Sequence, residues 1–188
     1  MEEIFQFLYS IYPLSKKCKK HLLKVVQKVD VKRGEFLLRP GEVSQRLYFI
    51  KKGLLRCYYP IGKTKVTAWF FWEMHAVVSI RSWYTQTPGN QFIEALEDCT
   101  LYSISYDQLE YAYKTFPEFN YVGRVLTIKY LMEWDRLVEN IRLFRTHERY
   151  QLILEQQPEV LQRVLDRDLA TYLGMTPEAL SRARGKIK

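Results

Sequence analysis

The sequence contains few of the residues that build disulfide frameworks and metal centres. Its 188 residues include three cysteines and three histidines. These are Cys18, Cys57, Cys99, His21, His75 and His147. An odd number of widely spaced cysteines argues against a disulfide framework and suggests a reducing compartment. The histidines fall in three separate regions, so we expect no metal site, because a catalytic ion needs several ligands that converge.

Sequence motifs of catalysis and of membrane association are also missing. The chain shows no Gly-rich phosphate loop, nucleophile elbow or Cys/His pair, so we expect neither enzymatic activity nor a cofactor. Its first residues, Met1 to Phe5, lack the basic charge of a signal peptide. No apolar run approaches the roughly 20 residues of a membrane span. We therefore expect a cytoplasmic protein that does not associate with membranes.

The charge balance is basic but unevenly distributed. A formal net charge of +8 favours an anionic partner without choosing between nucleic acid and membrane. Residues 116–188 carry 12 Lys and Arg against 10 Asp and Glu, so most of the excess lies nearer the N-terminus. Lysines between residues 16 and 28 contribute to it, and a solvated helix face is their simplest explanation. A DNA-binding function must therefore rest on local placement of charge.

Residues 31 to 105 have the pattern of many short strands. Runs rich in β-branched and aromatic side chains alternate with turns that contain glycine. The predicted strands cover residues 35–38, 47–50, 54–59, 66–71, 91–96 and 101–105. Gly34, Gly41, Gly53 and Gly62 stand at corners, where a positive φ favours glycine. This pattern predicts an α+β protein whose N-terminal part is a β-roll, that is, a double-stranded β-helix or jelly roll.

Helical patterns flank this region. Residues 2–28 predict two short helices, with Ser15 as the N-cap of the second and an apolar stripe that extends to Val29. Apolar side chains then recur at helical spacing from Pro117 to Phe144. A helix of this span is roughly 40 Å long, too long for one face of a small domain. We expect it to pair with its own copy in a homodimer, and the alternative is a core helix lying across the β-rich domain.

A shorter helix is predicted from Thr146, as its N-cap, to about residue 156, where a proline follows. These boundaries divide the chain into three parts. Residues 1–115 are expected to form the β-roll sensor domain, residues 116–145 the dimerisation helix, and residues 146–188 a DNA-binding domain.

Residues 166–185 fit a helix-turn-helix. The two helices cross closely, so the middle of the first must be small, as Ala170 is. The turn needs a residue that tolerates a positive φ, and Gly174 is placed there. Thr176 can cap the second helix, and Pro177 suits its first position. The inward-facing apolar residues are Leu169, Leu173, Met175, Leu180 and Ala183.

The outward face of the second helix is expected to enter the major groove of DNA. The predicted DNA-binding residues are Thr176, Pro177, Glu178, Ser181, Arg182, Arg184 and Lys186. Arg182 can donate two hydrogen bonds to guanine, and Glu178 can accept one from cytosine. The residues expected at phosphates are Arg184, Lys186 and Lys188, with Arg163 and Arg167 as weaker candidates. The alternative explanation is an ordinary helical hairpin with exposed charges.

With these patterns the sequence resembles the Crp/Fnr family, the catabolite-activator type of transcription regulator. The resembling segments are VKRGEFLLRPGE (residues 31–42), LYFIKKGLLR (47–56), EALEDC (94–99) and DLATYLGMTPEALSR (168–182). The first three resemble parts of the family's β-roll, and the last resembles its DNA-reading module. The resemblance spans nearly the whole chain. It implies a homodimer through residues 117–144, a cyclic-nucleotide-binding-like domain, and double-stranded DNA as partner.

The family's nucleotide cassette is not matched. That cassette has a Phe-Gly-Glu segment, then an Arg-Ser/Thr-Ala segment whose Arg pairs with the cyclic phosphate. Here residues 73–83 lack the Gly-Glu pair, and Gly89-Asn90-Gln91 stands in place of Arg-Ser-Ala. An unpaired buried phosphate is costly, so we expect a degenerate pocket. The candidate effector residues are Trp69, Phe71, Arg81, Trp83, Tyr84, Asn90 and Gln91. Core packing is the expected role of most of the aromatic ones, and a small effector or an empty roll are the open alternatives.

The sequence therefore predicts a dimeric, sequence-specific DNA-binding transcription regulator with a degenerate cyclic-nucleotide pocket. Its two recognition helices would engage half-sites roughly 34 Å apart. The alternative is a small-ligand or protein-interaction module that does not bind DNA. Retention on a DNA or heparin column that falls steeply with salt distinguishes the regulator, because phosphate contacts release counterions.

Overall fold

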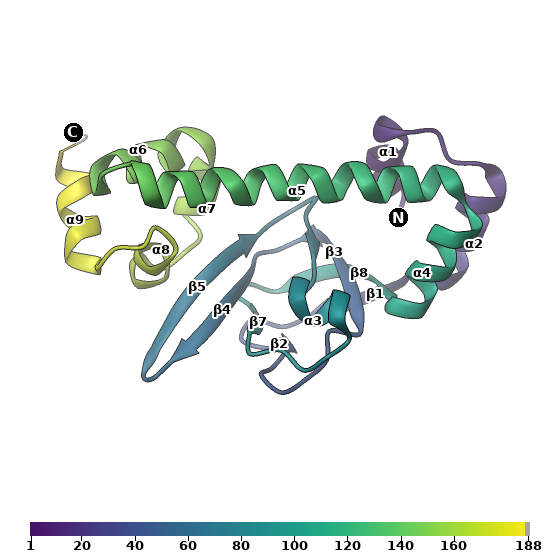
Figure 1. Cartoon of the computed structure of the whole chain (residues 1–188), viewed down its shortest axis with the longest axis horizontal. Helices are drawn as coiled ribbons and strands as arrows, with labels where there is room; N and C mark the ends of the chain where they lie inside the picture. Colours follow the sequence, from purple (N-terminus) through teal and green to yellow (C-terminus); the bar gives the residue numbers. More distant parts are fainter. Residues whose placement is uncertain (187–188) are drawn as a thin grey trace.

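The computed structural model describes residues 1–186 and shows a β-roll beside one long helix (Figure 1). The N-terminal elements are α1 (Glu2–Ile11), α2 (Lys16–Val25), β1 (Gln27–Val31), β2 (Phe36–Leu38), β3 (Arg46–Lys52) and β4 (Leu55–Ile61). The middle elements are β5 (Thr64–Phe71), β6 (Ala76–Val77), α3 (Ile80–Thr85), β7 (Phe92–Ala95) and β8 (Cys99–Ser105). The remaining helices are α4 (Tyr106–Thr115), α5 (Pro117–Leu143), α6 (Thr146–Gln156), α7 (Pro158–Leu161), α8 (Asp166–Tyr172) and α9 (Pro177–Gly185).

Two antiparallel four-stranded sheets form the roll. Their strand orders are β1-β8-β3-β6 and β2-β7-β4-β5. Side chains from both sheets, among them Ile50, Leu55, Ile93 and Leu101, are buried between them in one apolar cluster. The β-roll predicted from the spacing of strands and turns is therefore confirmed.

The glycines at the corners of the roll have the conformation expected of them. Gly34, Gly41, Gly53 and Gly62 all have positive φ. Gly53 is also constrained by space, because a Cβ atom there would lie 2.4 Å from the Cys99 sulfur. No other residue fits at this corner without moving β8.

Some elements differ from those that the sequence predicts. The second helix ends at Val25, and Val29 lies in β1 opposite Leu101, so the predicted helical stripe that reached Val29 is wrong. This segment forms a strand despite its helical pattern of apolar residues, because it pairs with β8, which is distant in the chain. The sequence did not predict the short elements β6 and α3, because a run of two to six residues is too short to show a strand or helix periodicity.

Helix α5 has 27 residues and connects the two ends of the molecule, as expected from its apolar repeat. Figure 1 shows α1, α2 and α4 at its N-terminal end, α6 to α9 at its C-terminal end, and the roll between them. Near its start, Phe119 and Val122 are buried in a cluster with Phe5 and Leu22 of the first two helices. Among residues 1–186, no helix is both long and apolar enough to span a membrane.

Helix α6 begins one residue differently from the prediction. Arg145, not Thr146, is the N-cap, because the Glu148 carboxylate accepts a hydrogen bond from the Arg145 backbone N–H at 2.6 Å. The helices that follow share an apolar cluster with the roll, which contributes Leu54 and Phe70. The C-terminal helices are thus packed onto the roll as well as connected to α5.

Candidate nucleic-acid interface

Helices α8 and α9 form a helix-turn-helix around Gly174. Gly174 has a φ of +64°, in the left-handed region that favours glycine. The Met175 backbone N–H donates to the Ala170 carbonyl at 2.9 Å and closes the turn, while Ala170 itself is fully buried. The buried apolar residues of the pair also include Leu169, Leu173, Leu180 and Ala183. The predicted compact helix pair is confirmed.

The start of α9 presents a polar, exposed face. The Thr176 hydroxyl accepts a hydrogen bond from the Ala179 backbone N–H at 3.2 Å and caps the helix, as predicted. The exposed residues of this face are Thr176, Pro177, Glu178, Ser181 and Arg182. Hydrogen bonds from its own backbone N–H and from Thr176 lower the pKa of Glu178, so its side chain stays a charged acceptor. We call these five residues the recognition face.

The basic residues beside the recognition face differ in their partners. Lys186 is exposed just after α9. The Arg184 Nη1 atom lies 2.6 Å from Asp166 Oδ2, and the Arg184 guanidinium lies over the Tyr150 ring. Arg167 is exposed on α8. Lys188, also expected at a phosphate, lies outside the described residues.

A buried ion pair joins α8 to the roll. Arg56 Nη1 in β4 lies 2.9 Å from Asp168 Oδ1 in α8, and these side chains are only 3% and 7% exposed. Arg56 Nε also donates to the Thr67 hydroxyl at 2.9 Å, and Nη2 donates to the Lys65 carbonyl at 3.1 Å. Burial lowers the pKa of Arg56, and the Asp168 carboxylate opposes this effect. Each charge of the pair needs the other, because a lone buried charge is costly.

Neighbouring contacts extend this junction along β5. The Thr171 hydroxyl of α8 accepts a hydrogen bond from the Thr67 backbone N–H at 3.1 Å. The Tyr172 ring lies edge-on to the rings of Phe70 and Trp69, with centroid distances of 5.2 and 6.1 Å. The first helix of the helix-turn-helix therefore contacts the β4–β5 hairpin through both polar and aromatic side chains.

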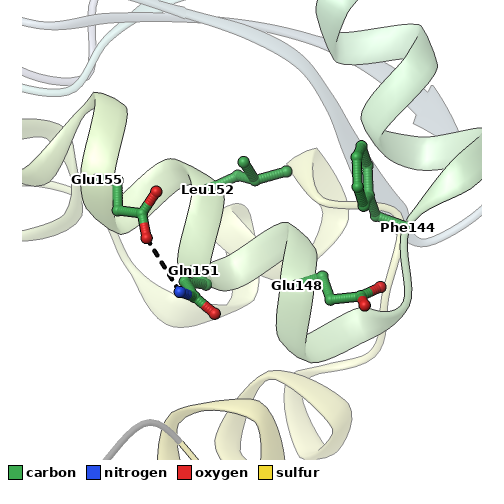
Figure 2. Close-up of a pocket in the computed structure, with 5 residues that line it drawn as sticks. All are labelled: Phe144, Glu148, Gln151, Leu152 and Glu155. Carbon is green, nitrogen blue, oxygen red and sulfur yellow. Dashed lines mark hydrogen bonds between the residues drawn. The ribbon is translucent and has the colours of Figure 1, made fainter.

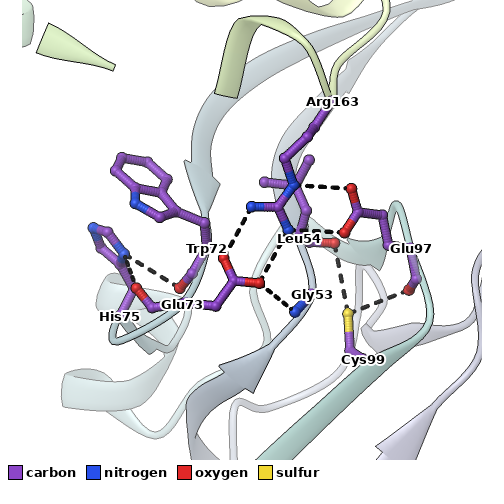
Figure 3. Close-up of polar contacts among 8 residues, drawn as sticks. All are labelled: Gly53, Leu54, Trp72, Glu73, His75, Glu97, Cys99 and Arg163. Atoms are coloured by element: carbon purple, nitrogen blue, oxygen red, sulfur yellow. Dashed lines mark hydrogen bonds and ion pairs between the residues drawn. The ribbon is translucent and has the colours of Figure 1, made fainter. Parts of the chain in front are cut away.

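Arg163, a weaker candidate for a phosphate contact, is held by carboxylates of the roll instead (Figure 3). Its Nη1 atom lies 2.9 Å from Glu73 Oε2, and its Nη2 atom lies 2.8 Å from Glu97 Oε2. Glu73 also accepts the backbone N–H of Gly53 at 2.8 Å. Hydrogen bonds to Glu97 and Glu73 raise the pKa of Arg163. This guanidinium thus forms part of the contact between the C-terminal helices and the roll.

The residues expected around an effector are spread over several environments. Trp69 packs against Tyr172 of α8, and Trp83 is buried against Tyr106 in the cluster of N-terminal helices. Phe71 packs within the roll. Gln91 accepts a hydrogen bond from the Ser79 hydroxyl and donates one to the Tyr59 hydroxyl. The exposed members of the set are Arg81, Tyr84 and Asn90. The structure does not gather these seven residues in one place.

Two shallow hollows lie elsewhere in the described part of the chain. The first, of about 220 Å³, lies between α6 and the end of α5 and is lined by Phe144, Glu148, Gln151, Leu152 and Glu155 (Figure 2). The second, of about 350 Å³, opens on the roll beside Leu38, Ser44, Arg46, Tyr48 and Ile93. Within residues 1–186, no three His, Cys, Asp or Glu side chains are grouped to hold a metal ion.

Helix α5 has a second apolar face that is largely exposed, although the Tyr121 ring at one end of it packs on Tyr12 with a centroid distance of 4.9 Å. Its inner face packs on the rest of the chain, and there the Tyr130 hydroxyl accepts a hydrogen bond from the Ala76 backbone N–H at 2.7 Å. Trp134 and Leu143 of α5 are exposed as well. The other exposed apolar residues are Tyr121, Ile128, Leu131 and Met132, which are 41%, 44%, 61% and 55% exposed. They recur at helical spacing along one side. We call these four residues the outer stripe of α5.

Sequence reasoning missed the residues that join α8 to the roll. Arg56, Thr67 and Asp168 lie in segments whose local pattern predicts only a strand or a helix. An aspartate near a helix start has an ordinary explanation in the helix dipole, so Asp168 gave no signal of a buried partner.

Comparison with known proteins agrees with this geometry. Residues 28–116 match the cyclic nucleotide-binding domain family. A search of curated protein sequences gives no match. The structure of FixK2 from Bradyrhizobium japonicum is similar with a TM-score of 0.75 at 17% identity, covering 87% of this chain and 84% of that one.

Two further structures support the same fold. The c-di-GMP responsive global regulator CLP from Xanthomonas campestris has a TM-score of 0.70 at 18% identity, covering 92% of this chain and 91% of that one. A transcriptional regulator assigned to the Crp/Fnr family, from Eubacterium rectale, has a TM-score of 0.72 at 18% identity, covering 93% and 83%. The chain therefore carries a cyclic nucleotide-binding domain at residues 28–116 and has the fold of the Crp/Fnr family regulators.

Proposed function

We propose that this protein is a dimeric, sequence-specific DNA-binding transcription regulator of the Crp/Fnr type. The observation that carries the proposal is the recognition face: an exposed polar start of α9 on a buried apolar helix pair. In this proposal residues 1–115 form the sensor domain, residues 116–145 the dimerisation helix and residues 146–188 the DNA-binding domain. The protein acts in the cytoplasm and does not catalyse a reaction.

The recognition face suits the edges of bases in a major groove. Arg182 is exposed and carries the planar donor fork that pairs with guanine O6 and N7. Glu178 stays ionised and accepts from cytosine N4. Thr176, Pro177 and Ser181 complete the contact surface. Lys186 contacts a phosphate, as does Arg184 once its guanidinium exchanges Asp166 for the DNA backbone.

The outer stripe of α5 supports self-association. Exposed apolar side chains at helical spacing on a long helix are typical of a face that packs against another helix. A second copy provides the same stripe, as a two-fold interface requires. The dimer would then present two recognition faces to a near-palindromic operator, with half-sites roughly 34 Å apart.

The cyclic-nucleotide pocket is degenerate in this proposal. In the family a cassette arginine pairs with the cyclic phosphate, whereas here Ser79 and Gln91 bond to each other at 2.6 Å and Gln91 bonds onward to Tyr59. These neutral side chains satisfy one another, and none of them is a cation that could pair with a phosphate. The residues present therefore do not fit a cyclic nucleotide, and an effector, where one exists, has a different chemistry.

Selection of bound duplexes from a random pool tests the proposed function. We expect an enriched, near-palindromic sequence, with an affinity that falls steeply as salt increases. Arg182→Ala should weaken the enrichment and relax it at one position of each half-site. Arg33→Ala serves as the matched control, because Arg33 is exposed on the roll, away from α9. Failure of the wild-type protein to enrich any sequence would contradict the proposal.

The alternative is a small-ligand or protein-interaction module without DNA binding. The hollow of about 350 Å³ beside Arg46 and Tyr48 is the feature that favours it. A module of this kind would show weak, salt-insensitive behaviour on a DNA column, whereas the regulator would be retained at low salt and released as salt increases.

A further inference from the structure

The recognition face is carried by a helix pair that is itself fixed to the roll. Figure 1 shows α8 beside β5, and four side chains hold α8 on the β4–β5 hairpin. These are Arg56, Thr67, Asp168 and Thr171, which we call the α8 seat. Helix α9 packs on α8 through Leu169 and Leu180, which share one buried cluster. Any rotation of α8 in its seat therefore turns α9 as well.

We propose that Arg56 and Thr67 are positioning residues for DNA reading: the β4–β5 hairpin fixes the orientation in which α9 is offered to the groove. This inference rests on the proposed function and deepens it, because it assigns a role to roll residues that do not touch DNA. The route from the roll to the recognition face then runs through β4, β5 and α8.

The chemistry of the seat suits a positioning role. Apolar contacts tolerate sliding, but a guanidinium with a different acceptor at each nitrogen is fixed in both place and direction. Arg56 has these acceptors in Asp168, Thr67 and Lys65. The pair is buried, so water does not compete for its hydrogen bonds.

The seat presents the recognition face instead of hiding it. Glu178, Ser181 and Arg182 all stay exposed while α8 is docked. An autoinhibitory contact would cover these residues. The docked arrangement is therefore the one competent to read DNA, and undocking lowers affinity by reducing the population of that arrangement.

The experiment replaces the ion pair as a unit in the full-length protein. Arg56→Met with Asp168→Leu exchanges a buried pair for apolar side chains, a change that proteins often tolerate, and it leaves the net charge unchanged. The matched control is Lys32→Met with Asp98→Asn, which removes an ion pair on the surface of the roll. Arg56→Lys is the conservative variant, because it keeps the charge and loses the planar fork.

Two measurements separate docking from DNA binding. The Thr67 backbone N–H donates across the seat to Thr171, so its hydrogen-exchange rate by NMR reports docking without any DNA. Fluorescence anisotropy over a range of salt concentrations measures the affinity for the selected duplex and so reports DNA recognition. We expect the double variant to speed Thr67 exchange and to weaken affinity by roughly tenfold, with an unchanged salt slope. The control should match wild type, and Arg56→Lys should fall between them.

Each other outcome has a definite meaning. Faster Thr67 exchange with unchanged affinity would overturn the positioning role while leaving DNA binding intact. Weaker affinity with a shallower salt slope would also overturn it, because the loss would then come from phosphate contacts. A wild-type protein that binds no duplex would overturn the proposed function itself. Should the double variant not fold, an Arg56→Lys protein that keeps wild-type exchange and affinity rejects the inference.

Discussion

Arg149 of α6 donates hydrogen bonds to the turn that contains Gly174. Its Nη1 atom lies 3.1 Å from the Leu173 carbonyl oxygen and 3.4 Å from that of Gly174. The same guanidinium donates through Nε to the Phe144 carbonyl at the end of α5. One side chain thus connects the end of the long helix to the turn of the helix-turn-helix. A substitution at this turn should therefore change the free energy of unfolding.

Gly174→Ala should lower the free energy of unfolding by about 1–2 kcal/mol, because an L-residue at a φ of +64° is strained. The new Cβ would also lie 3.4 Å from Arg149 Nη1. Urea denaturation followed by circular dichroism measures the change. Gly185→Ala is the control: its φ is not positive and its surroundings are open, so up to about 1 kcal/mol of added helix stability is expected. Equal effects of the two substitutions would contradict this explanation.

Arg182→Ala should weaken binding to the selected operator by about 1–3 kcal/mol and relax the base preference at one position of each half-site. Non-specific binding should change little, since it depends on phosphate contacts. Anisotropy titrations with the operator and with base-substituted duplexes measure both effects. An unchanged operator affinity would show that the recognition face is wrongly assigned.

Leu131→Glu should dissociate the proposed dimer. Leu131 is 61% exposed on the outer stripe, and pairing would bury the new carboxylate in an apolar interface. A cost of roughly 3 kcal/mol corresponds to about a hundredfold weaker dimer. Sedimentation equilibrium measures the dissociation constant. Leu23→Glu is the control, because Leu23 is 50% exposed on α2 and lies off the stripe. A wild-type protein that is monomeric at every concentration would refute the dimer.

Removal of Arg163 should cost stability in a pH-dependent way. Burial opposes ionisation of Glu73, but hydrogen bonds from Arg163 and Gly53 outweigh it and lower the pKa of Glu73 below 4.5. A lowered carboxyl pKa stabilises the folded state above the unfolded-state value and loses that effect as pH falls through the folded-state value. Arg163→Met should therefore destabilise by about 1 kcal/mol at pH 7, a value reduced by solvent screening.

Thermal unfolding of wild type and Arg163→Met from pH 7 to pH 3 measures this dependence. We expect the difference between them to shrink as pH falls below 4.5, the ordinary glutamate value, and through the lowered folded-state pKa of Glu73. Lys32→Met, which breaks an exposed pair within the roll, is the control and should change stability little. A difference that stays constant with pH would show that Arg163 acts through packing alone.

Cyclic AMP and cyclic GMP should bind with dissociation constants weaker than about 1 mM, if at all. The reason is the Ser79–Gln91 pair, which offers a phosphate no positive charge. Isothermal titration calorimetry checks this directly. Micromolar binding of either nucleotide would contradict the degenerate pocket and would require the cassette to rearrange.

Local signals in the sequence predicted much of this fold. The strands of the roll, the helix from Pro117 and the turn at Gly174 follow from side-chain periodicity, a fixed proline φ and the steric freedom of glycine. The recognition face follows in the same way, since an N-cap at Thr176 and helical spacing place its residues on one side. Short elements such as β6, and the strand at residues 27–31, were decided by pairing partners elsewhere.

The sequence alone determined most of the strands and helices and which residues of α9 face outward, because these choices depend on neighbours within a few positions. Only the tertiary structure decided that Arg56 meets Asp168, that Arg163 turns to Glu73 and Glu97, and that the expected effector residues separate. Such contacts join segments far apart in the chain. Their partners depend on how the roll and the C-terminal helices pack. That packing cannot be read from the side-chain periodicity of either segment.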